Sequence, residues 1–244
     1  MKAGLRWLAL VLLAALGLQL FFVLRIAAMA WVAPQSTSFQ RSEAWRLLHA
    51  DGALRWRQQW LPYAQISDPL KRAVVASEDD GFVSHEGVDW DAIERAWERN
   101  NRAEERAERA QARHPGTPVR APRIRGGSTI TQQLAKNLLL SPERSYVRKG
   151  QEFVLAFALE LLLSKQRILE IYLNSVEWGE GVFGAEAAAQ RYFGTSARRL
   201  SAAQAARLAV MLPAPRRYEK NPGSAYLAAR TRTIMARMDS ARLP

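Results

Sequence analysis

The sequence predicts a mainly α-helical protein that begins with a membrane-spanning helix. Residues 7–33 are almost continuously apolar, and only Gln19 and Arg25 interrupt them. Beyond this run, apolar residues recur at helical spacing, and no useful length of chain alternates between apolar and polar residues as strands do. Apolar residues make up 48% of the chain, which is enough to build a packed core.

The N-terminal apolar run is long enough to cross a bilayer core. Lys2 and Arg6 precede it, and positive charge before a span predicts a cytoplasmic N-terminus and an exported remainder. Residues 1–33 are therefore expected to be a cytoplasmic tip and a transmembrane anchor. A cleaved signal peptide is the alternative, because residues 28–30 read Ala-Met-Ala, which resembles a cleavage site. The run is long for a signal peptide, and this favours a retained anchor.

The formal net charge of +12 indicates an anionic partner, which could be nucleic acid, anionic lipid or an anionic substrate. The chain has no cysteine, so it forms neither disulfides nor cysteine-ligated zinc sites. Residues 34–66 are expected to be a linker segment with polar turns and several aromatic residues.

Helical patterning starts near Pro69, where Leu70, Val74 and Val75 share one face of a predicted helix. A helix capped by Ser201 is expected to end at Pro213. The further predicted helices cover residues 89–113, 145–164, 165–174, 201–212 and 224–239.

Residues 99–125 form a basic excursion that is rich in Arg, Glu and Pro. From Arg95 to Arg125 the chain has nine Arg and four Glu. We favour a solvated, partly helical surface excursion. A basic arm on anionic lipid headgroups is an alternative, because the anchor is near. A nucleic-acid arm is the weakest, since the excursion lacks interleaved aromatic residues and an exported domain meets little nucleic acid. We expect no nucleic-acid partner.

The segment 126–137 reads GGSTITQQLAKN and is typical of a helix start that binds an anion. Its glycines allow close backbone approach, and Ser128, Thr129 and Thr131 supply hydroxyls. The backbone N–H groups of a helix start, together with Lys136, suit a phosphate. The order of residues is not that of a Walker loop. The alternative is a glycine turn followed by an ordinary capped helix.

Three adjacent acids, Glu78, Asp79 and Asp80, follow the first predicted helix of the exported part. Crowded and buried carboxylates raise one another's pKa, so one of them could act as a general base. The alternative is an acidic helix C-terminus with a turn at Gly81, although acids at that end oppose the helix dipole. A structural role is favoured for the lone His85.

In the segment 144–160, Arg148, Glu152 and Glu160 recur at helical spacing and share one face, and Arg144 lies one turn earlier. Ordinary pairing between residues one turn apart explains part of this pattern. The helix is otherwise apolar, so its charges either face solvent or line a polar cleft.

Taken in order, these motifs make the chain similar to the peptidoglycan glycosyltransferases of the penicillin-binding-protein type, glycosyltransferase family 51. The resemblance covers roughly residues 54–220, and the absence of a transpeptidase domain makes the chain similar to the monofunctional members. The matching motifs are Glu78-Asp79-x-x-Phe82-x-x-His85-x-Gly87-x-Asp89, GGSTITQQLAKN, Arg148-Lys149-x-x-Glu152, Ile168-Leu169-Glu170-x-Tyr172-Leu173-Asn174 with Gly179, Gly184 and Tyr192-Phe193-Gly194, and residues 208–215.

The resemblance implies a lysozyme-like, mainly α glycosyltransferase domain over residues 67–244, with a small membrane-facing lobe. It implies a single-pass protein of the bacterial inner membrane whose catalytic domain is periplasmic. The implied substrates are lipid II and the growing glycan chain. Glu78 would deprotonate the 4-hydroxyl of the acceptor GlcNAc, which attacks the donor MurNAc with inversion and release of undecaprenyl pyrophosphate. Cell-division or cell-wall synthesis proteins are the implied protein partners.

The resemblance also gives roles to the polar residues around this base. Ser128, Lys136, Arg144 and Arg148 would hold the pyrophosphate. Glu152 would support that site, directly or by holding a divalent cation such as Mg²⁺ or Mn²⁺. The remaining residues of the second motif would contact sugars or form the framework, and they are Thr129, Gln132, Gln133 and Asn137.

Two rival functions remain open at this point. One is a lytic glycosidase that acts on finished glycan, and the other is a catalytically inactive scaffold of the cell-wall machinery. The chain departs from the usual family pattern in the extra acid at Asp80 and in the length of the excursion 99–125.

Overall fold

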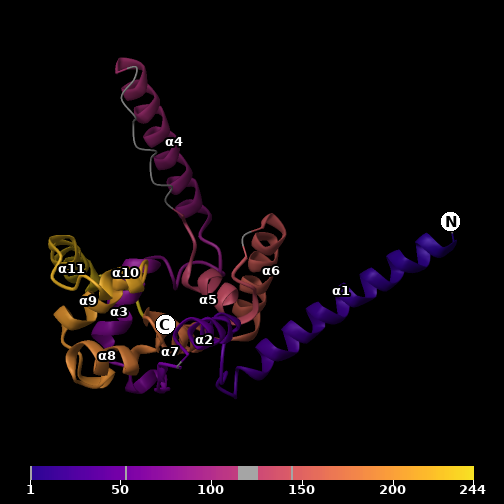
Figure 1. Ribbon diagram of the computed structural model, residues 1–244, viewed down its shortest axis with the longest axis horizontal. Helices are drawn as coiled ribbons and strands as arrows, with labels where there is room; N and C mark the ends of the chain where they lie inside the picture. Colours follow the sequence, from indigo (N-terminus) through magenta and orange to yellow (C-terminus); the bar gives the residue numbers. More distant parts are fainter. Residues whose placement is uncertain (1, 53, 115–125, 144) are drawn as a thin grey trace.

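A computed structural model of the chain describes residues 2–52, 54–114, 126–143 and 145–244 (Figure 1). The predicted mainly α-helical class is confirmed, because eleven α-helices and only three short strands occur in these ranges. The helices are α1 (Lys2–Ala28), α2 (Ser38–Asp51), α3 (Asp68–Glu78), α4 (Trp90–Arg113), α5 (Ile130–Leu139), α6 (Tyr146–Leu162), α7 (Lys165–Ser175), α8 (Ala185–Phe193), α9 (Ala202–Met211), α10 (Pro215–Glu219) and α11 (Ala225–Met238). Short 3-10 turns at Tyr63–Gln65 and Ala197–Arg199 and the strands β1 (Arg57–Gln58), β2 (Glu177–Gly179) and β3 (Val182–Phe183) complete the set.

Helix α1 extends away from the body of the molecule (Figure 1). It is the one helix among the described residues that is long and apolar enough to cross a membrane. The C-terminal part of α1, from Gln19 onward, packs against the domain, and Phe22 and Ile26 are buried there. The side-chain amides of Gln19 and Gln151 of α6 donate to each other at 2.9 Å. The exposed apolar surface of the rest of α1 is consistent with a single-pass membrane anchor.

The core of the body forms around α3, which packs against α9 and α11, and around α5, which packs against α2, α6 and α7. Leu70, Val74 and Val75 are fully buried on α3, so the predicted apolar face is confirmed. Helix α9 begins after Ser201 and ends before Pro213, also as predicted. Ser201 accepts a hydrogen bond from the backbone N–H of Gln204, which fixes the start of the helix.

A three-stranded sheet in the order β1-β3-β2 was not predicted. β3 pairs parallel with β1 and antiparallel with β2. Each strand has only two or three residues, which is too short to produce an alternating sequence pattern. Gly181 turns the chain between β2 and β3 with a φ of +69°, and a Cβ there would lie 1.9 Å from the carbonyl oxygen of Arg55. The turn therefore requires glycine.

The predicted linker segment 34–66 contains the whole of α2, which its sequence pattern did not indicate. Thr37 and Gln40 form a capping box at its start. Helix α2 packs against α5, and the Ser38 hydroxyl donates to the carbonyl oxygen of Leu138 at 3.1 Å. This helix therefore supports the segment that carries the GGSTITQQLAKN motif.

The predicted helix at 89–113 is confirmed as α4, which stands out from the body (Figure 1). Asp89 caps it by accepting from the backbone N–H of Ala92 at 2.7 Å. Along its outer part, Arg102 pairs with Glu98 and Arg109 pairs with Glu105, all with exposed side chains. The part of the predicted excursion that covers residues 115–125 lies outside the described residues.

Candidate active site

Asp79 is the C-cap residue of α3, and its side chain joins the first motif to the second. Its Oδ2 accepts from the backbone N–H of Ile130, the first residue of α5, at 2.9 Å. Its Oδ1 lies 2.9 Å from Nε2 of His85. Because Nδ1 of His85 accepts from the backbone N–H of Gly87, the ring proton belongs on Nε2, which donates to Asp79. The structural role expected for His85 agrees with this geometry.

Thr129 and Gln132 fix the start of α5 from inside the protein. Thr129 accepts from the backbone N–H of Gln132 and donates its hydroxyl proton to the carbonyl oxygen of Gly87 at 2.6 Å. Gln132 reciprocates by accepting from the backbone N–H of Thr129. Both side chains are buried, so their geometry is that of framework residues. Ser128 is exposed immediately before them.

A cavity of about 400 Å³ brings four of the predicted residues together. Gln133, Lys136 and Asn137 lie on one face of α5, and Arg148 reaches the cavity from α6. Residues three and four apart on a helix share a face, and this places the three α5 side chains side by side. The wall is completed by Phe39, Leu140, Ser141, Pro142, Val176, Glu177, Leu212, Pro213 and Pro215. This cavity is called the cleft below.

Glu78 is joined to the cleft by Gln133, whose Nε2 donates to Oε2 of Glu78 at 3.2 Å. Ser77 donates to the other carboxylate oxygen at 3.4 Å. Glu78 makes no ion pair within the described ranges. Burial raises the pKa of Glu78, and the neighbouring charge of Asp79 raises it further, while the bonds from Gln133 and Ser77 and the charge of Arg230 lower it. A carboxyl group with a raised pKa and no ion pair is suited to accept a proton.

Tyr172 fixes the orientation of the Gln133 amide. Its hydroxyl donates to Oε1 of Gln133 at 3.0 Å, which leaves the Nε2 group directed at Glu78. Burial, with the charges of Glu78 and Asp79, raises the pKa of Tyr172 well above its ordinary value, so the phenol keeps its proton. Tyr172 was not among the site residues predicted from the sequence, although it lies in the fourth motif.

Glu152 is surrounded by cations. Only 3% of this residue is exposed. Nη1 of Arg148 donates to its Oε2 at 3.1 Å, and Nζ of Lys149 pairs with its Oε1. Glu152 thereby holds the Arg148 side chain in the cleft wall. The fourth predicted pyrophosphate residue, Arg144, lies outside the described residues.

The described residues do not fit a divalent-cation site built by the protein alone. No group of three or more His, Cys, Asp or Glu side chains gathers among them. Both oxygens of Glu152, the predicted ligand, are already in ion pairs. The cation stays a prediction, and no step below passes through it.

Glu177 is a further cleft residue, and it was not predicted from the sequence. It lines the cavity from β2, and Nε of Arg216 donates to its Oε1 at 2.8 Å. Burial raises the pKa of Glu177, and the bond from Arg216 opposes that shift. No local pattern marks this residue, because it follows a helix end and enters a very short strand.

A second set of contacts holds the first motif against α6. Lys165 donates to Oε1 of Glu160 at 2.8 Å and to the carbonyl oxygen of His85 at 2.6 Å. Thr131 of α5 donates to the same oxygen of Glu160. The sequence predicted that Glu160 shares a helix face with Glu152. In the structure, Glu160 bonds to Lys165 and Thr131 and so helps to hold the first motif in place.

Comparison with known proteins shows the family of this chain. A family model described as Transglycosylase matches residues 49–239. The chain belongs to the transglycosylase family. A "Biosynthetic peptidoglycan transglycosylase" from Paraburkholderia xenovorans (strain LB400) is 51% identical over 243 residues, which cover 98% of this chain and 94% of the relative. A relative of the same name from Herminiimonas arsenicoxydans is 53% identical over 239 residues, which cover 98% of this chain and 96% of the relative.

Family membership makes this transglycosylase an enzyme, a peptidoglycan glycosyltransferase that acts in cell-wall synthesis. The family-model match begins within α2 and ends after α11, so it includes every residue of the cleft except Phe39. It also includes Glu78, Tyr172 and Glu152. The resemblance stated on the five motifs is thereby confirmed.

Proposed function

We propose that this transglycosylase polymerises lipid II into glycan strands, with inversion at the anomeric carbon and release of undecaprenyl pyrophosphate. The observation that carries the proposal is the division of charge around the cleft. Glu78 is hydrogen-bonded by the neutral side chains of Gln133 and Ser77, while Lys136 and Arg148 line the cavity with positive charge. A hydroxyl nucleophile needs a base, and a pyrophosphate leaving group needs fixed cations.

Glu78 takes the proton of the GlcNAc 4-hydroxyl of the acceptor. The oxygen attacks the anomeric carbon of the donor MurNAc from the side opposite the pyrophosphate. The new C–O bond forms as the bond to the leaving oxygen breaks, so the configuration inverts. The raised pKa of Glu78 brings it closer to the working pH, which makes it a stronger base than an ordinary glutamate. Gln133 and Tyr172 hold its carboxylate in place.

Lys136 and Arg148 neutralise the charge that develops on the departing pyrophosphate. Glu152 acts on this step through Arg148, because its carboxylate fixes the position of the guanidinium group. Ser128 and Arg144 complete the pyrophosphate site in this proposal on the strength of the motif resemblance alone. Asn137 also faces the cleft, where its amide can contact a sugar.

The substrate is anchored in lipid, so the enzyme must act at a membrane. In this proposal α1 is a single-pass anchor in the bacterial inner membrane. Lys2 and Arg6 keep the N-terminus in the cytoplasm, which places the catalytic domain in the periplasm. Lipid II and the growing glycan chain are the substrates, and proteins of cell division or cell-wall synthesis are the proposed partners.

The direct test is to incubate the purified full-length protein in non-ionic detergent with lipid II. We expect glycan polymer and one undecaprenyl pyrophosphate for every bond formed. A parallel reaction with chelator tests the expected divalent cation. Finished glycan strands serve as the second substrate: shortening of these strands with lipid II untouched would point to a lytic glycosidase. Loss of neither substrate would point to an inactive scaffold.

A further inference from the structure

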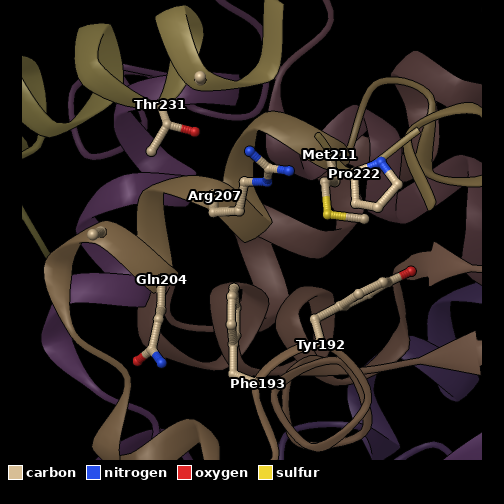
Figure 2. Close-up of a pocket in the computed structure, with 9 residues that line it drawn as sticks. Tyr192, Phe193, Gln204, Arg207, Met211, Pro222 and Thr231 are labelled. Atoms are coloured by element: carbon tan, nitrogen blue, oxygen red, sulfur yellow. The ribbon is translucent and has the colours of Figure 1, made fainter. Parts of the chain in front are cut away.

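A second cavity, of about 440 Å³, lies between α8, α9 and α11. Figure 2 shows the Arg207 side chain near the centre of this cavity, with the rings of Tyr192 and Phe193 on one side. Met211 and Pro222 add further apolar surface. None of these residues lines the cleft or belongs to the proposed mechanism. This cavity is called the Arg207 pocket below.

Three polar side chains of the Arg207 pocket already form hydrogen bonds within the protein. The Thr231 hydroxyl donates to the carbonyl oxygen of Leu227 at 2.8 Å. Tyr192 donates its hydroxyl proton to the carbonyl oxygen of Trp178 at 2.8 Å. Oε1 of Gln204 accepts from the backbone N–H of Ser201 at 2.9 Å.

Two hydrogen-bond donors of the pocket have no acceptor in the described part of the chain. They are the guanidinium of Arg207 and the amide NH₂ of Gln204. One turn of α9 separates the two residues, so both side chains project from the same face. Paired donors next to apolar walls match a carboxylate that is carried on an apolar body.

The charge around the pocket favours an acidic ligand. Residues 191–244 contain eleven Lys and Arg but only two Asp and Glu, so this part of the chain contributes most of the net charge of +12. A positive field of this kind attracts acidic partners and repels basic ones.

The position of the pocket favours a protein over a lipid. Helices α9 and α11 lie at the end of the body opposite α1 (Figure 1). Because α1 is the helix that is long and apolar enough to cross a membrane, the pocket lies on the side of the body away from the proposed anchor. This position favours a ligand whose carboxylate belongs to a soluble molecule.

We propose that the Arg207 pocket binds an acidic segment of a protein partner. One apolar side chain of the segment fills the cavity against Phe193 and Met211. A neighbouring carboxylate accepts from the guanidinium of Arg207 and from the amide of Gln204. This docking site does not depend on the proposed reaction, because it shares no residue with the cleft.

The test uses the full-length protein in non-ionic detergent and a fluorescein-labelled probe peptide in which a Leu-Phe pair lies between Glu and Asp residues. Binding is followed by fluorescence anisotropy. One control peptide replaces Leu and Phe by Ser, and another replaces the acids by their amides. We expect the probe to bind at least about tenfold tighter than either control, because charge and apolar contact both contribute.

The protein variants separate the pocket from its basic surroundings. Arg207→Met is expected to weaken probe binding about tenfold, and Ala228→Trp, which fills the cavity from an exposed position, is expected to do the same. Arg232→Met is the matched control, since it removes the same charge from an exposed site on α11 outside the pocket. It should change binding by less than about twofold. All three variants should polymerise lipid II at the rate of the unmodified protein.

Three results would overturn the proposal. The first is an equal loss of binding in Arg207→Met and Arg232→Met, which would mean attraction by charge alone. The second is equal affinity for the probe and for either control peptide. The third is displacement of the probe by anionic lipid dispersed in the same detergent or by finished glycan strands, which would assign the pocket to another ligand.

Discussion

Two glutamates flank the same cleft in opposite surroundings. Glu78, at the end of α3, is hydrogen-bonded by the neutral side chains of Gln133 and Ser77, and burial raises its pKa. Glu152, on α6, forms ion pairs with Arg148 and Lys149. The contrast teaches that the surroundings, and not the residue type, decide which carboxylate can accept a proton and which one holds a cation in place.

A second pair of sites extends the contrast to ion pairs. Arg148–Glu152 and Arg109–Glu105 have the same spacing of four residues along a helix. The side chains of the first pair are 18% and 4% exposed, and those of the second are 73% and 60% exposed. Only the first pair lies in an environment where water does not screen its charges. The predictions below test both contrasts.

The largest effect is expected for Glu78→Gln. The amide cannot accept the hydroxyl proton, so lipid II polymerisation should fall by a factor on the order of a hundred to ten thousand. The measurement is the initial rate of polymer formation by the purified variant. Asp80→Asn is the matched control, because this exposed neighbour pairs with Arg237 and lies outside the cleft. Its rate should stay within about twofold of the unmodified protein.

The same substitution should raise stability, which also checks that the variant folds. Folding raises the pKa of the Glu78 carboxyl group. Below its pKa in the unfolded chain the group is protonated in both states and does not reduce the free energy of unfolding. That free energy falls as the pH rises from the unfolded pKa through the folded pKa. At pH 8, Glu78→Gln should therefore unfold at a higher temperature than the unmodified protein, and at pH 4 the difference should shrink. An unfolding temperature below that of the unmodified protein at pH 8 would contradict a desolvated carboxylate.

Glu152→Gln is expected to reduce polymerisation by about tenfold to a hundredfold, less than Glu78→Gln. The variant keeps the cations of the cleft but no longer fixes the Arg148 guanidinium. We expect kcat to fall while KM for lipid II does not rise, because the cleft becomes more positive. A loss as complete as that of Glu78→Gln, with the pH dependence also removed, would place Glu152 in the proton transfer itself.

A smaller effect is expected for Gln133→Leu. The bond from Gln133 favours the ionised form of Glu78, so its removal should raise the pKa of Glu78 further. Activity at neutral pH should fall a few-fold, by roughly two to ten times, and recover as the pH increases. Tyr172→Phe, which removes only the bond to Oε1 of Gln133, should shift the pH profile in the same direction by less. An unchanged profile in both variants would separate Gln133 from the base.

The smallest effect is expected on α4. Arg109→Met should change the free energy of unfolding by less than about 0.5 kcal/mol, because the pair with Glu105 is exposed and screened. Arg148→Met removes a partner of a buried carboxylate and should cost about 2 kcal/mol or more. Thermal unfolding of both variants in the same detergent compares the two losses. Equal shifts would remove the distinction between the pairs.

Much of the fold could be predicted because its signals are local. The apolar run of α1, the buried face of α3 and the Ser201 cap of α9 depend on residues close together in the sequence. The sheet could not be predicted, because its strands are too short to carry a pattern and β1 pairs with a strand more than a hundred residues away. Helix α2 is held by contact with α5, and no sequence pattern displays that contact.

The candidate site divides in the same way. Glu78 and the face of α5 that carries Gln133 and Lys136 follow from motifs and helical spacing. The link from Tyr172 through Gln133 to Glu78 joins three helices, so only the folded chain displays it. The same holds for the Arg207 pocket, whose walls come from α8, α9 and α11.

The central claim is that Glu78 is the base and that Glu152 fixes the guanidinium of Arg148. It is tested most directly by the pH dependence of kcat/KM for lipid II polymerisation. For the unmodified protein we predict that kcat/KM falls toward acidic pH, and that the midpoint of this acid limb lies above the ordinary pKa of glutamate, because burial raises the pKa of Glu78. Glu152→Gln should keep that limb at a lower plateau, and the residual activity of Glu78→Gln should lack it. The account is contradicted if Glu78→Gln keeps the limb and Glu152→Gln loses it.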